Sequence, residues 1–447
     1  MTQTQTHTDE PRLGADGTDE RQLGADSADE PRLGADSADE LSLGTDYEAL
    51  AERFRPLFAR IAEGALLREQ DRALPREEIA LLAEAGFGAV RVPRKYGGAG
   101  ASLPQLIELL AELAAADSNI PQALRGHFAY VEDRLNQHAT ADQSAWFARF
   151  VSGEIAGNAW TEIGDVLVGE VNTKVRGTGD GLVVDGTKYY STGSIFADWL
   201  DVYAEREEDG VPVIAIVKAD QPGVTILDDW DGFGQKTTGS GTAVLEGARV
   251  EAENVTVFAD RFRYQTAFYQ LVHLATLAGI VTAAAREVAG EAHARTRVFS
   301  HGSAPRWRDD PLVQQTVGVA TAQGFAARAI AVRAAESSQD AYLARFAVAA
   351  GSADPEAEQR ANQRAELDSA QGQIVLVDLS LRATSDVLNA LSASAASDAK
   401  KLDRFWRNAR TVSSHNPVVF KQRIVGDWAV NGTPVPYEWA IGAQKPA

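Results

Sequence analysis

The stretch of residues 406–417, Trp406-Arg407-Asn408-Ala409-Arg410-Thr411-Val412-Ser413-Ser414-His415-Asn416-Pro417, decides how the whole chain is interpreted. It lies between two segments, Glu356 to Ala393 and Phe420 to Ala429, in which apolar residues recur three and four apart, as on one face of a helix. The amide of Asn416 cannot accept a proton at neutral pH, so this residue cannot be a general base. The imidazole of His415 is of a type whose pKa lies near neutrality, which suits proton transfer.

The C-terminal part of the chain, residues 260–435, is predicted to be a helical bundle. Three long runs with helical periodicity each exceed three turns: Tyr264 to Ala294, Asp310 to Ser338 and Glu356 to Ala393. Together with the shorter run that follows Pro417, they predict a four-helix bundle. Residues 436–447 are expected to form a C-terminal tail.

The middle of the chain, residues 157–259, is predicted to be a β domain because its apolar residues alternate with a period of two. Short β-branched segments bounded by turn residues are typical of antiparallel strands in a small barrel or sandwich. These segments are residues 182–190, 199–204, 211–217, 224–227 and 242–250. Residues 47–156 show helical periodicity and predict an N-terminal helical domain, so the expected fold class is α+β with several domains.

The composition indicates a soluble protein that does not bind nucleic acid. The 447 residues carry a formal net charge of −20, and no basic stripe offsets it. The chain has no Cys, which excludes disulfides, thiolate metal sites and cysteine nucleophiles. The most apolar run, Leu271 to Ala285, is shorter than the ~20 residues that span a bilayer. The first ten residues lack the features of a secretory signal, so we expect a cytoplasmic location and no membrane partner.

A ten-residue repeat occupies residues 1–46. The unit Asp-Glu-Pro-Arg-Leu-Gly-Ala-Asp begins at Asp9 and recurs at Asp19, Asp29 and, in degraded form, Asp39. Twelve of these 46 residues are acidic, and one Leu per unit cannot build a core. A disordered acidic tail is the favoured interpretation, and an array that binds a partner such as a reductase is the alternative.

Two motifs and the order of domains resemble the acyl-CoA dehydrogenase family. The loop from Val92 to Gly100 is similar to a Pro/Gly loop of that family, and the run ending at Arg410 is similar to its R-D-A-R-like run. In the dehydrogenases, the glutamate that removes the substrate α-proton stands six residues after that run, where this chain has Asn416. The resemblance covers residues 47–435 and implies the family's order of a helical domain, a β domain and a helical bundle.

The residues His415-Asn416-Pro417 resemble the His-Asp-Pro-like run of the flavin-dependent monooxygenase branch, typified by the dibenzothiophene monooxygenases. That branch uses reduced flavin and oxygen. Its histidine is associated with the flavin C4a-hydroperoxide, which implies catalytic roles for His415 and the adjacent Asn416. The dibenzothiophene type also carries a second histidine three residues earlier, where this chain has Val412. The acid–base partner of His415 therefore stays open.

Three further segments resemble the flavin site of the family. Gly157 to Gly164 is similar to its "x-x-T-E-x-G" motif, Lys188 to Ser194 to its "K-x-W-I-T-N-G" strand, and Trp230 to Thr242 to its "G-x-R-x-x-x-S-x-T" turn. Singly, such aromatic residues would be interpreted as core residues, whereas three motifs in family order favour the flavin site. The resemblance implies cofactor contacts for Trp160, Thr161, Tyr190, Ser191 and Thr192, and substrate contacts for Trp230 and Ser240.

Two segments bear on which flavin is bound. Arg295 to Ser300 resembles an "R-x-x-F-G" run that reaches the cofactor of a neighbouring subunit, which implies cofactor roles for Arg297 and Phe299 in a homotetramer. Residues 390–400 stand where FAD-dependent members have a Gly-rich segment that lets a neighbouring backbone approach the adenosine half, and they contain no Gly. The resemblance therefore favours FMN over FAD.

Asn158 and His127 are weaker candidates for the catalytic site. Asn158 can donate a hydrogen bond to a substrate oxygen, and His127 lies on the helix that lines the substrate cavity in the family. The seven histidines show no metal-ligand spacing, so no metal is expected. No dinucleotide-binding Gly motif follows a predicted strand, so a separate flavin reductase is expected to supply reduced flavin by free diffusion.

The sequence therefore predicts a two-component, FMN-dependent monooxygenase that acts with oxygen on an organosulfur or aromatic small molecule. Two alternatives stay open. An FAD-dependent acyl-CoA dehydrogenase or oxidase could use a relocated base, for which Glu287 and Glu291 are candidates. A non-catalytic scaffold of the same fold would bind no flavin and would use its acidic repeats for interaction.

Overall fold

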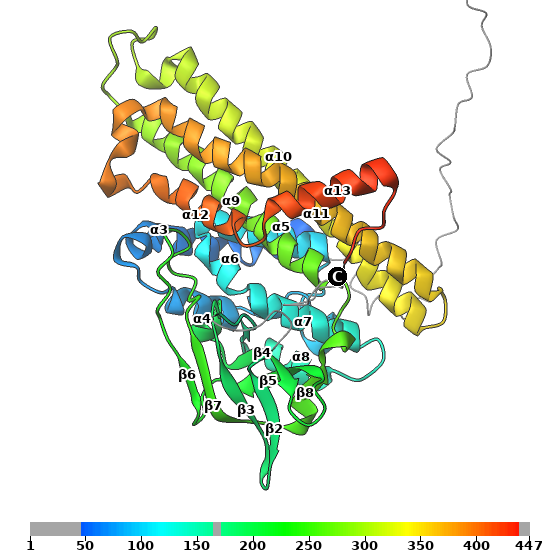
Figure 1. Cartoon of the computed structure of the whole chain (residues 1–447). Helices are drawn as coiled ribbons and strands as arrows, with labels where there is room; N and C mark the ends of the chain where they lie inside the picture. Colours follow the sequence, from blue (N-terminus) through cyan, green and yellow to red (C-terminus); the bar gives the residue numbers. More distant parts are fainter. Residues whose placement is uncertain (1–45, 164–170, 438–447) are drawn as a thin grey trace, which may run out of the picture.

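The computed structural model describes residues 46–163 and 171–437. Helices from both ends of the chain stack together in the upper part of Figure 1, and a β-sheet lies below them. The acidic repeats in residues 1–45 and the tail from residue 438 lie outside the described residues. The predicted order of a helical region, a β region and a second helical region is confirmed.

The N-terminal domain consists of helices that begin and end at local signals. At the start of α5, Ser102 Oγ accepts from the Gln105 amide and the Gln105 side chain accepts from the Ser102 amide, which satisfies two otherwise unpaired donors. α3 ends at Arg72, which adopts a left-handed conformation. The helices are α2 (Tyr47–Glu52), α3 (Arg55–Asp71), α4 (Arg76–Glu84), α5 (Leu103–Ala116), α6 (Asn119–Ala123), α7 (Arg125–Gln137) and α8 (Ser144–Val151).

The middle domain is one mixed sheet with eight strands among the described residues, in the order β6-β7-β3-β2-β4-β5-β8 with β1 paired to β4. The strands are β1 (Ala156–Ala159), β2 (Lys174–Thr178), β3 (Gly181–Lys188), β4 (Trp199–Arg206), β5 (Pro212–Lys218), β6 (Val224–Ile226), β7 (Ala243–Val250) and β8 (Val255–Val257). The antiparallel prediction is wrong for two pairings, because β1 and β2 run parallel to β4. Parallel pairing joins segments that are distant in sequence, so no local turn signals it.

The C-terminal domain is built around α9 (Gln265–Ala294), which is longer than the apolar run within it. By length and composition α9 could cross a membrane, but 94% of its most apolar window is buried inside the protein, as in the core helix of a bundle. A Cβ on Gly279 would lie 2.3 Å from the Ala114 Cβ, so only glycine lets α5 approach this closely. The other helices are α10 (Pro311–Ala349), α11 (Pro355–Asp386), α12 (Asp403–Ser413) and α13 (Val418–Asn431).

The bundle differs from the predicted set of four helices. α13 lies along α11 but buries none of its side chains fully. Instead, α5 of the N-terminal domain packs against α9 and α10, so both helical domains share one hydrophobic core. The helix predicted to reach Ala393 ends at Asp386, and a 3-10 segment with a kink at Ser392 follows it.

Candidate active site

A cavity of about 210 Å³ opens between α7, the first turns of α9 and the junction after α12. Arg125 lines it from α7, and Tyr269 lines it from α9. His415 lines it from the junction, so the end of the stretch at residues 406–417 forms one wall of the cavity. The remaining lining residues are Thr266, Gln270, Asn416, Pro417, Phe420 and Lys421.

His415 lies beside a second histidine, His273 of α9, with the ring centres 4.4 Å apart. Burial lowers the pKa of His273 well below its usual value, and the nearby His415 and Arg125 lower it further. Although His415 keeps accessible surface, the surrounding protein lowers its pKa to about 3, and Arg125 contributes. Both imidazoles are therefore neutral at pH 7. Within the described residues, neither ring nitrogen of His273 has a hydrogen-bond partner.

Asn416 fixes the junction to the bundle. Its Nδ2 donates to Gln270 Oε1 at 3.1 Å, and its backbone carbonyl accepts from Gln373 Nε2 at 2.8 Å. Its Oδ1 lies 3.4 Å from His415 Nδ1. When Nδ1 carries the proton and donates to this amide oxygen, Nε2 of His415 is left as the proton acceptor. Asn416 thus orients the imidazole and offers no base of its own.

A row of hydroxyl groups lies on the loops that lead into and out of the sheet. Thr192 Oγ1 is 2.8 Å from Ser240 Oγ, which is 2.7 Å from Thr238 Oγ1. The adjacent Ser191 is fully buried, and its Oγ has no hydrogen-bond partner in the part of the chain that the structure describes. Buried polar atoms are rarely left unpaired, so this hydroxyl is available to a ligand.

Tyr190 presents an aromatic face beside this row. It is 53% exposed, and its ring lies edge-on to Trp230 with a centroid distance of 6.0 Å. Its backbone has φ +54°, in the left-handed region that non-glycine residues seldom adopt. Strain of this kind occurs at functional sites more often than elsewhere. The predicted residues Tyr190, Ser191, Thr192, Trp230 and Ser240 are thus brought together.

Close backbone contacts join the hydroxyl row to the cavity wall. A Cβ on Gly193 would lie 1.9 Å from the Ala123 carbonyl, so the turn after Thr192 packs directly on the end of α6. On the adjacent strand β1, Asn158 lies against Gly126 of α7, where a Cβ would be 3.0 Å from the Asn158 Oδ1. Among described residues, this buried Oδ1 has no hydrogen-bond partner, so it too is available to a ligand.

A second connection runs from the sheet to α12. The Gln235 amide donates to Asn408 Oδ1 at 2.6 Å, and Gln235 Nε2 donates to Ser118 Oγ at 3.0 Å. A Cβ on Gly234 would lie 2.2 Å from the Arg407 carbonyl. These contacts hold α12, and the His415 junction that follows it, against the loop that carries Trp230.

Two predicted site residues belong to the core, and we correct their roles. Both ring nitrogens of His127 bond the backbone: Nε2 lies 3.0 Å from the Gly88 carbonyl, and Nδ1 accepts from the Ala156 amide at 3.2 Å. This fully buried ring is structural. The Trp160 side chain is 3% exposed and donates to Asp201 at 3.0 Å, so its indole packs in the core and does not face a ligand.

The other predicted cofactor residues are exposed. The Thr161 carbonyl accepts from the Tyr189 amide at 2.8 Å, which places it beside the strand that leads to Tyr190. Arg297 and Phe299 lie in the connection after α9, at the far end of that helix from His273. A single chain therefore does not bring these two residues to its own cavity, and their cofactor roles stay a prediction.

Both candidates for a relocated base form ion pairs. Glu287 accepts from both terminal nitrogens of Arg404, one at 3.1 Å, and Glu291 pairs with Lys400. The two glutamates lie 14 and 18 residues beyond His273, which is roughly 20 Å or more along the helix. Neither carboxylate reaches the cavity at His415, so these two candidates for a relocated base are wrong.

Sequence reasoning missed Arg125 and His273 as members of the site. Arg125 lies two residues before His127 on the same helix, and only the histidine is of a residue type whose usual pKa lies near neutrality. His273 stands inside an apolar run, where a lone histidine is usually a core residue. The sequence offered one signal for Arg125. No acidic residue stands three or four positions away, so no ion pair along the helix is expected for it.

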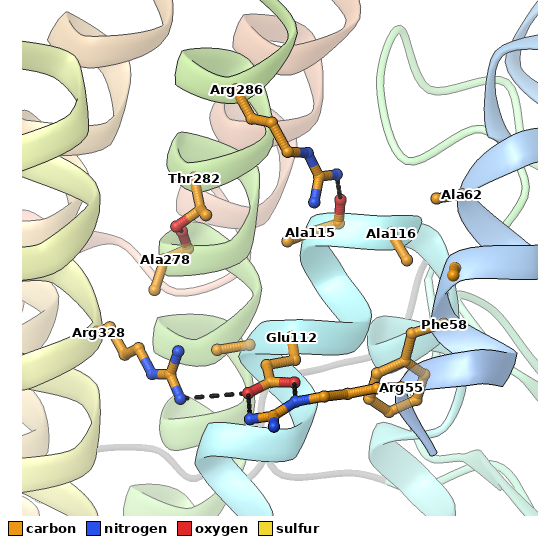
Figure 2. A pocket seen from close by; sticks show the side chains of 12 residues that line it. Arg55, Phe58, Ala62, Glu112, Ala115, Ala116, Ala278, Thr282, Arg286 and Arg328 are labelled. Carbon is orange, nitrogen blue, oxygen red and sulfur yellow. Dashed lines mark hydrogen bonds and ion pairs between the residues drawn. The ribbon is translucent and has the colours of Figure 1, made fainter. Parts of the chain in front are cut away.

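A larger cavity of about 340 Å³ lies elsewhere, between α3, α5, α9 and α10 (Figure 2). Its carboxylate, Glu112, is paired with Arg55 at 2.9 Å and Arg328 at 3.3 Å. Arg286 also lines it and donates to the Ala115 carbonyl at 2.6 Å. The rest of the lining is mostly alanine, without a histidine. The smaller cavity is therefore the better candidate for chemistry.

Known proteins resemble this chain along most of its length. Residues 45–154 match the acyl-CoA dehydrogenase N-terminal domain, and residues 271–420 match the acyl-CoA dehydrogenase C-terminal domain. A dibenzothiophene monooxygenase from Rhodococcus erythropolis is 27% identical over 379 residues, which cover 79% of this chain and 87% of the relative. A probable FMNH2-dependent monooxygenase, SfnC, from Pseudomonas putida is 26% identical over 391 residues, covering 84% and 93%.

A solved structure shares the fold. The complex of TdsC from Paenibacillus sp. A11-2 with FMN and indole has a TM-score of 0.76 and 27% identity, and the match covers 88% of this chain and 99% of TdsC. The likeness extends over all three regions of the described chain, the sheet included.

Proposed function

The chain belongs to the acyl-CoA dehydrogenase family, and we propose that it is a flavin-dependent monooxygenase, which uses reduced FMN and oxygen to oxygenate an organosulfur or aromatic small molecule. The observation that carries this proposal is the cavity at His415. Its lining, within the described residues, holds an imidazole, amides and an arginine but no carboxylate. A dehydrogenase of this family needs a carboxylate to remove the α-proton, whereas an oxygenase does not.

The residues on the loops after β3 and before β7 suit a flavin. The exposed Tyr190 ring offers a stacking surface, and the unpaired Ser191 hydroxyl and the Thr192–Ser240 pair offer hydrogen bonds to a polar ring edge. Asn158 Oδ1, on β1, is a further buried acceptor without a described partner, and it lies against Gly126 of α7. A flat aromatic ring with polar edges matches such a set of groups. When bound, reduced FMN supplies the activation of oxygen.

The segment before α12 favours FMN over FAD. Residues 390–400 contain no Gly, and Arg295 closes them by donating to the Leu391 carbonyl at 2.6 Å and to Ser394 Oγ at 3.0 Å. A segment held in this way leaves little freedom for an adenosine to lie against its backbone. FMN, which lacks the adenosine half, has no need of that approach.

In this proposal, the chain's own residues prepare the cavity for oxygen transfer. Asn416 orients the neutral His415 ring, and Nε2 of that ring takes up or returns a proton. The buried Tyr269 supplies an apolar wall that limits access of water to the reacting atoms, and the exposed Pro417 and Phe420 form the outer part of the lining. Asn158 positions the substrate or the flavin edge through its amide.

The finer assignments follow from this proposal. Reduced FMN arrives from a separate flavin reductase by free diffusion, and the enzyme works in the cytoplasm as a homotetramer. Support for the oligomer comes from Arg297 and Phe299, which are exposed on the connection after α9 and are free to reach the cofactor of a neighbouring subunit. The dibenzothiophene monooxygenase and SfnC relatives make an organosulfur compound the first substrate class to test.

Rapid mixing of the protein and reduced FMN with oxygenated buffer tests the proposal. We expect flavin reoxidation to pass through a long-lived absorbing species distinct from oxidised FMN, and product to form when a sulfide, sulfone or aromatic heterocycle is present. Reduction of tightly bound FAD by an acyl-CoA would contradict the proposal. Reoxidation identical to that of free flavin, with every substrate tried, would favour the non-catalytic scaffold.

A further inference from the structure

Arg125 is a buried cation without an acidic partner. Its side chain is 4% exposed and lines the cavity that contains His415. Its Nε is fully buried without a hydrogen-bond partner among the described residues, and no ion pair to a described carboxylate is formed. Its closest charge-related contact is the Tyr269 ring, whose centroid lies 5.0 Å from the guanidinium carbon. Arg125 therefore lines the cavity, and its guanidinium donates no hydrogen bond to any described residue.

The carboxylates on the surrounding elements are already paired. Glu366 of α11 accepts from Lys421 and from Thr266, and both of those residues also line the cavity. Behind Tyr269 and Trp160, the buried Asp201 pairs with Arg261 at 2.9 Å. The two histidines nearest Arg125 are neutral at pH 7. In the described part of the chain, the positive charge of Arg125 is thus left without a counter-charge.

A buried arginine keeps its proton, so its charge has to be met in some other way. Leaving a buried charge unpaired costs free energy, and most buried charges are paired within the protein. The guanidinium presents donors in a planar fork that matches the oxygens of a carboxylate, sulfinate or sulfonate. The unpaired His273 nitrogens and the His415 ring lie close by and provide further polar contacts.

We propose that Arg125 binds an oxyanion that is part of the substrate, so that the enzyme acts on small molecules bearing a sulfinate, sulfonate or carboxylate group. This inference rests on the proposed function, because it places the substrate in the cavity beside His415. The cavity of about 210 Å³ is small, so the anion stands close to the atom that is oxygenated. Neutral compounds, which leave the charge of Arg125 without a counter-charge, then bind more weakly than anionic compounds of the same size.

Binding to the flavin-free full-length protein tests this inference, because it does not depend on oxygenation. Isothermal titration compares benzenesulfonate with its neutral analogue methyl phenyl sulfone. Charged hydrogen bonds of this kind change affinity by about tenfold or more, so we expect benzenesulfonate to bind at least about tenfold more tightly. Arg125→Met should abolish this preference, and Arg125→Lys should keep part of it because it retains the charge but not the fork.

Arg286→Met is the matched control, because Arg286 lines the other cavity, in Figure 2, and also lacks a described carboxylate partner. Arg286→Met should bind the sulfonate as tightly as the wild type does. Loss of sulfonate binding in this variant would place the anion in the cavity at Arg286 and not in the cavity at Arg125. A second control, Glu438→Gln, removes the acidic residue next to Tyr437, whose carbonyl accepts from Thr266 at 3.1 Å. A clear gain of sulfonate affinity in that variant would mean that Arg125 has an internal counter-ion, which would overturn the inference.

The outcomes separate this inference from the proposed function. Equal affinity for the sulfonate and the sulfone would contradict the inference that Arg125 binds an oxyanion, but it would not contradict the oxygenase proposal. Tight sulfonate binding that depends on Arg125, combined with flavin reoxidation identical to that of free flavin, contradicts the oxygenase proposal alone. If the anion recognised by Arg125 were the reduced flavin itself, reduced FMN would bind more weakly to Arg125→Met while sulfonate affinity stayed equal to that of the wild type.

Discussion

His127 and His415, the two histidines predicted to be catalytic, differ in their surroundings, and this difference determines whether each ring can exchange a proton. His127 is enclosed by protein, and its two nitrogens bond backbone groups of neighbouring segments. His415 keeps accessible surface on a cavity, and only its Nδ1 faces a described polar group, the Asn416 side-chain oxygen. A ring whose nitrogens are both occupied cannot exchange a proton with a ligand. His415 is the one that retains this capacity.

The first prediction concerns His415→Ala. Because Nε2 is the proposed proton carrier, we expect product formation to fall by at least about a hundredfold, which is typical when a general acid or base is removed. FMN affinity should stay within tenfold of the wild-type value, since the flavin groups lie on the sheet loops. Product assays under reduced FMN, together with a flavin titration, check both parts. Loss of flavin binding along with activity would mean that His415 acts structurally.

The second prediction concerns His127→Leu. The change leaves the Gly88 carbonyl and the Ala156 amide buried without their partner, which costs about 2–4 kcal/mol of unfolding free energy. Once folded, the variant should retain flavin binding and product formation. Urea unfolding and a product assay at low temperature separate the two effects. A variant with full stability but no activity would restore a catalytic role for His127.

The same histidine makes stability depend on pH. Burial lowers the pKa of His127 to about 4 in the folded state, against 6.5 in the unfolded chain. Between these values the unfolded state binds a proton that the native state does not, so stability is complete above pH 6.5 and is lost as pH falls toward 4. The full effect is about 3 kcal/mol. Urea unfolding at pH 7.5 and pH 5 should show a smaller loss in His127→Leu, and an equal loss would remove His127 as a cause.

At the scale of secondary structure, periodicity predicted most elements within a few residues. The run from Tyr264 to Ala294 became α9, and the segment at 199–204 became β4. Both carry a regular apolar pattern that a sequence displays directly. The parallel partners β1 and β2 were missed because their pairing is long-range. α12 was not predicted as a separate helix, because its eleven residues are mostly polar.

The candidate site was predictable only in part, for a related reason. Tyr190, Thr192 and His415 lie on motifs with recognisable spacing, and the structure places them beside a cavity or in an open loop. Arg125 and His273 carry no motif, because their importance lies in what they fail to bond. Whether a buried polar atom is satisfied depends on segments far apart in sequence. No local pattern reports it.

A third prediction belongs to the segment between α11 and α12. Ser392 has φ 55° and ψ −148°, a conformation that favours glycine, and it is exposed. Ser392→Gly should therefore stabilise the protein by about 1 kcal/mol, by removing backbone strain. Ser397→Gly is the matched control, because this exposed serine has ordinary backbone angles and should lose a few tenths of a kcal/mol instead. Melting temperatures of the two variants should shift in opposite directions.

At the scale of the whole molecule, the two helical domains share one core, and the sheet is attached to them along the line of the proposed flavin site. α5 packs on α9, so neither helical domain is complete without the other. The sheet meets this helical body through the turn at Gly193 and through Gln235, both next to the hydroxyl row. A ligand bound there contacts both bodies and should stabilise their arrangement, as any ligand specific for the native state does.

The proposed homotetramer accounts for two features of the surface of the chain. α13 buries none of its side chains fully and exposes Val419 and Phe420, each to 60%. Exposed apolar residues on one helix are typical of a surface that another subunit covers. Arg297 is exposed after the C-terminal end of α9, whereas the cavity of its own chain lies at the first turns of that helix. Both observations are explained if neighbouring subunits exchange Arg297 across an interface.

The fourth prediction tests this exchange. Arg297→Ala should weaken FMN binding by about tenfold through loss of a charged contact to the phosphate, while Arg308→Ala, an exposed arginine on the same connection, should not. Flavin affinity of the wild type should fall when the protein is diluted until its subunits separate, because the donated arginine is then lost. Arg297→Ala should show the low affinity at every concentration. If flavin affinity changes neither on dilution nor in Arg297→Ala, the whole flavin site lies within one chain.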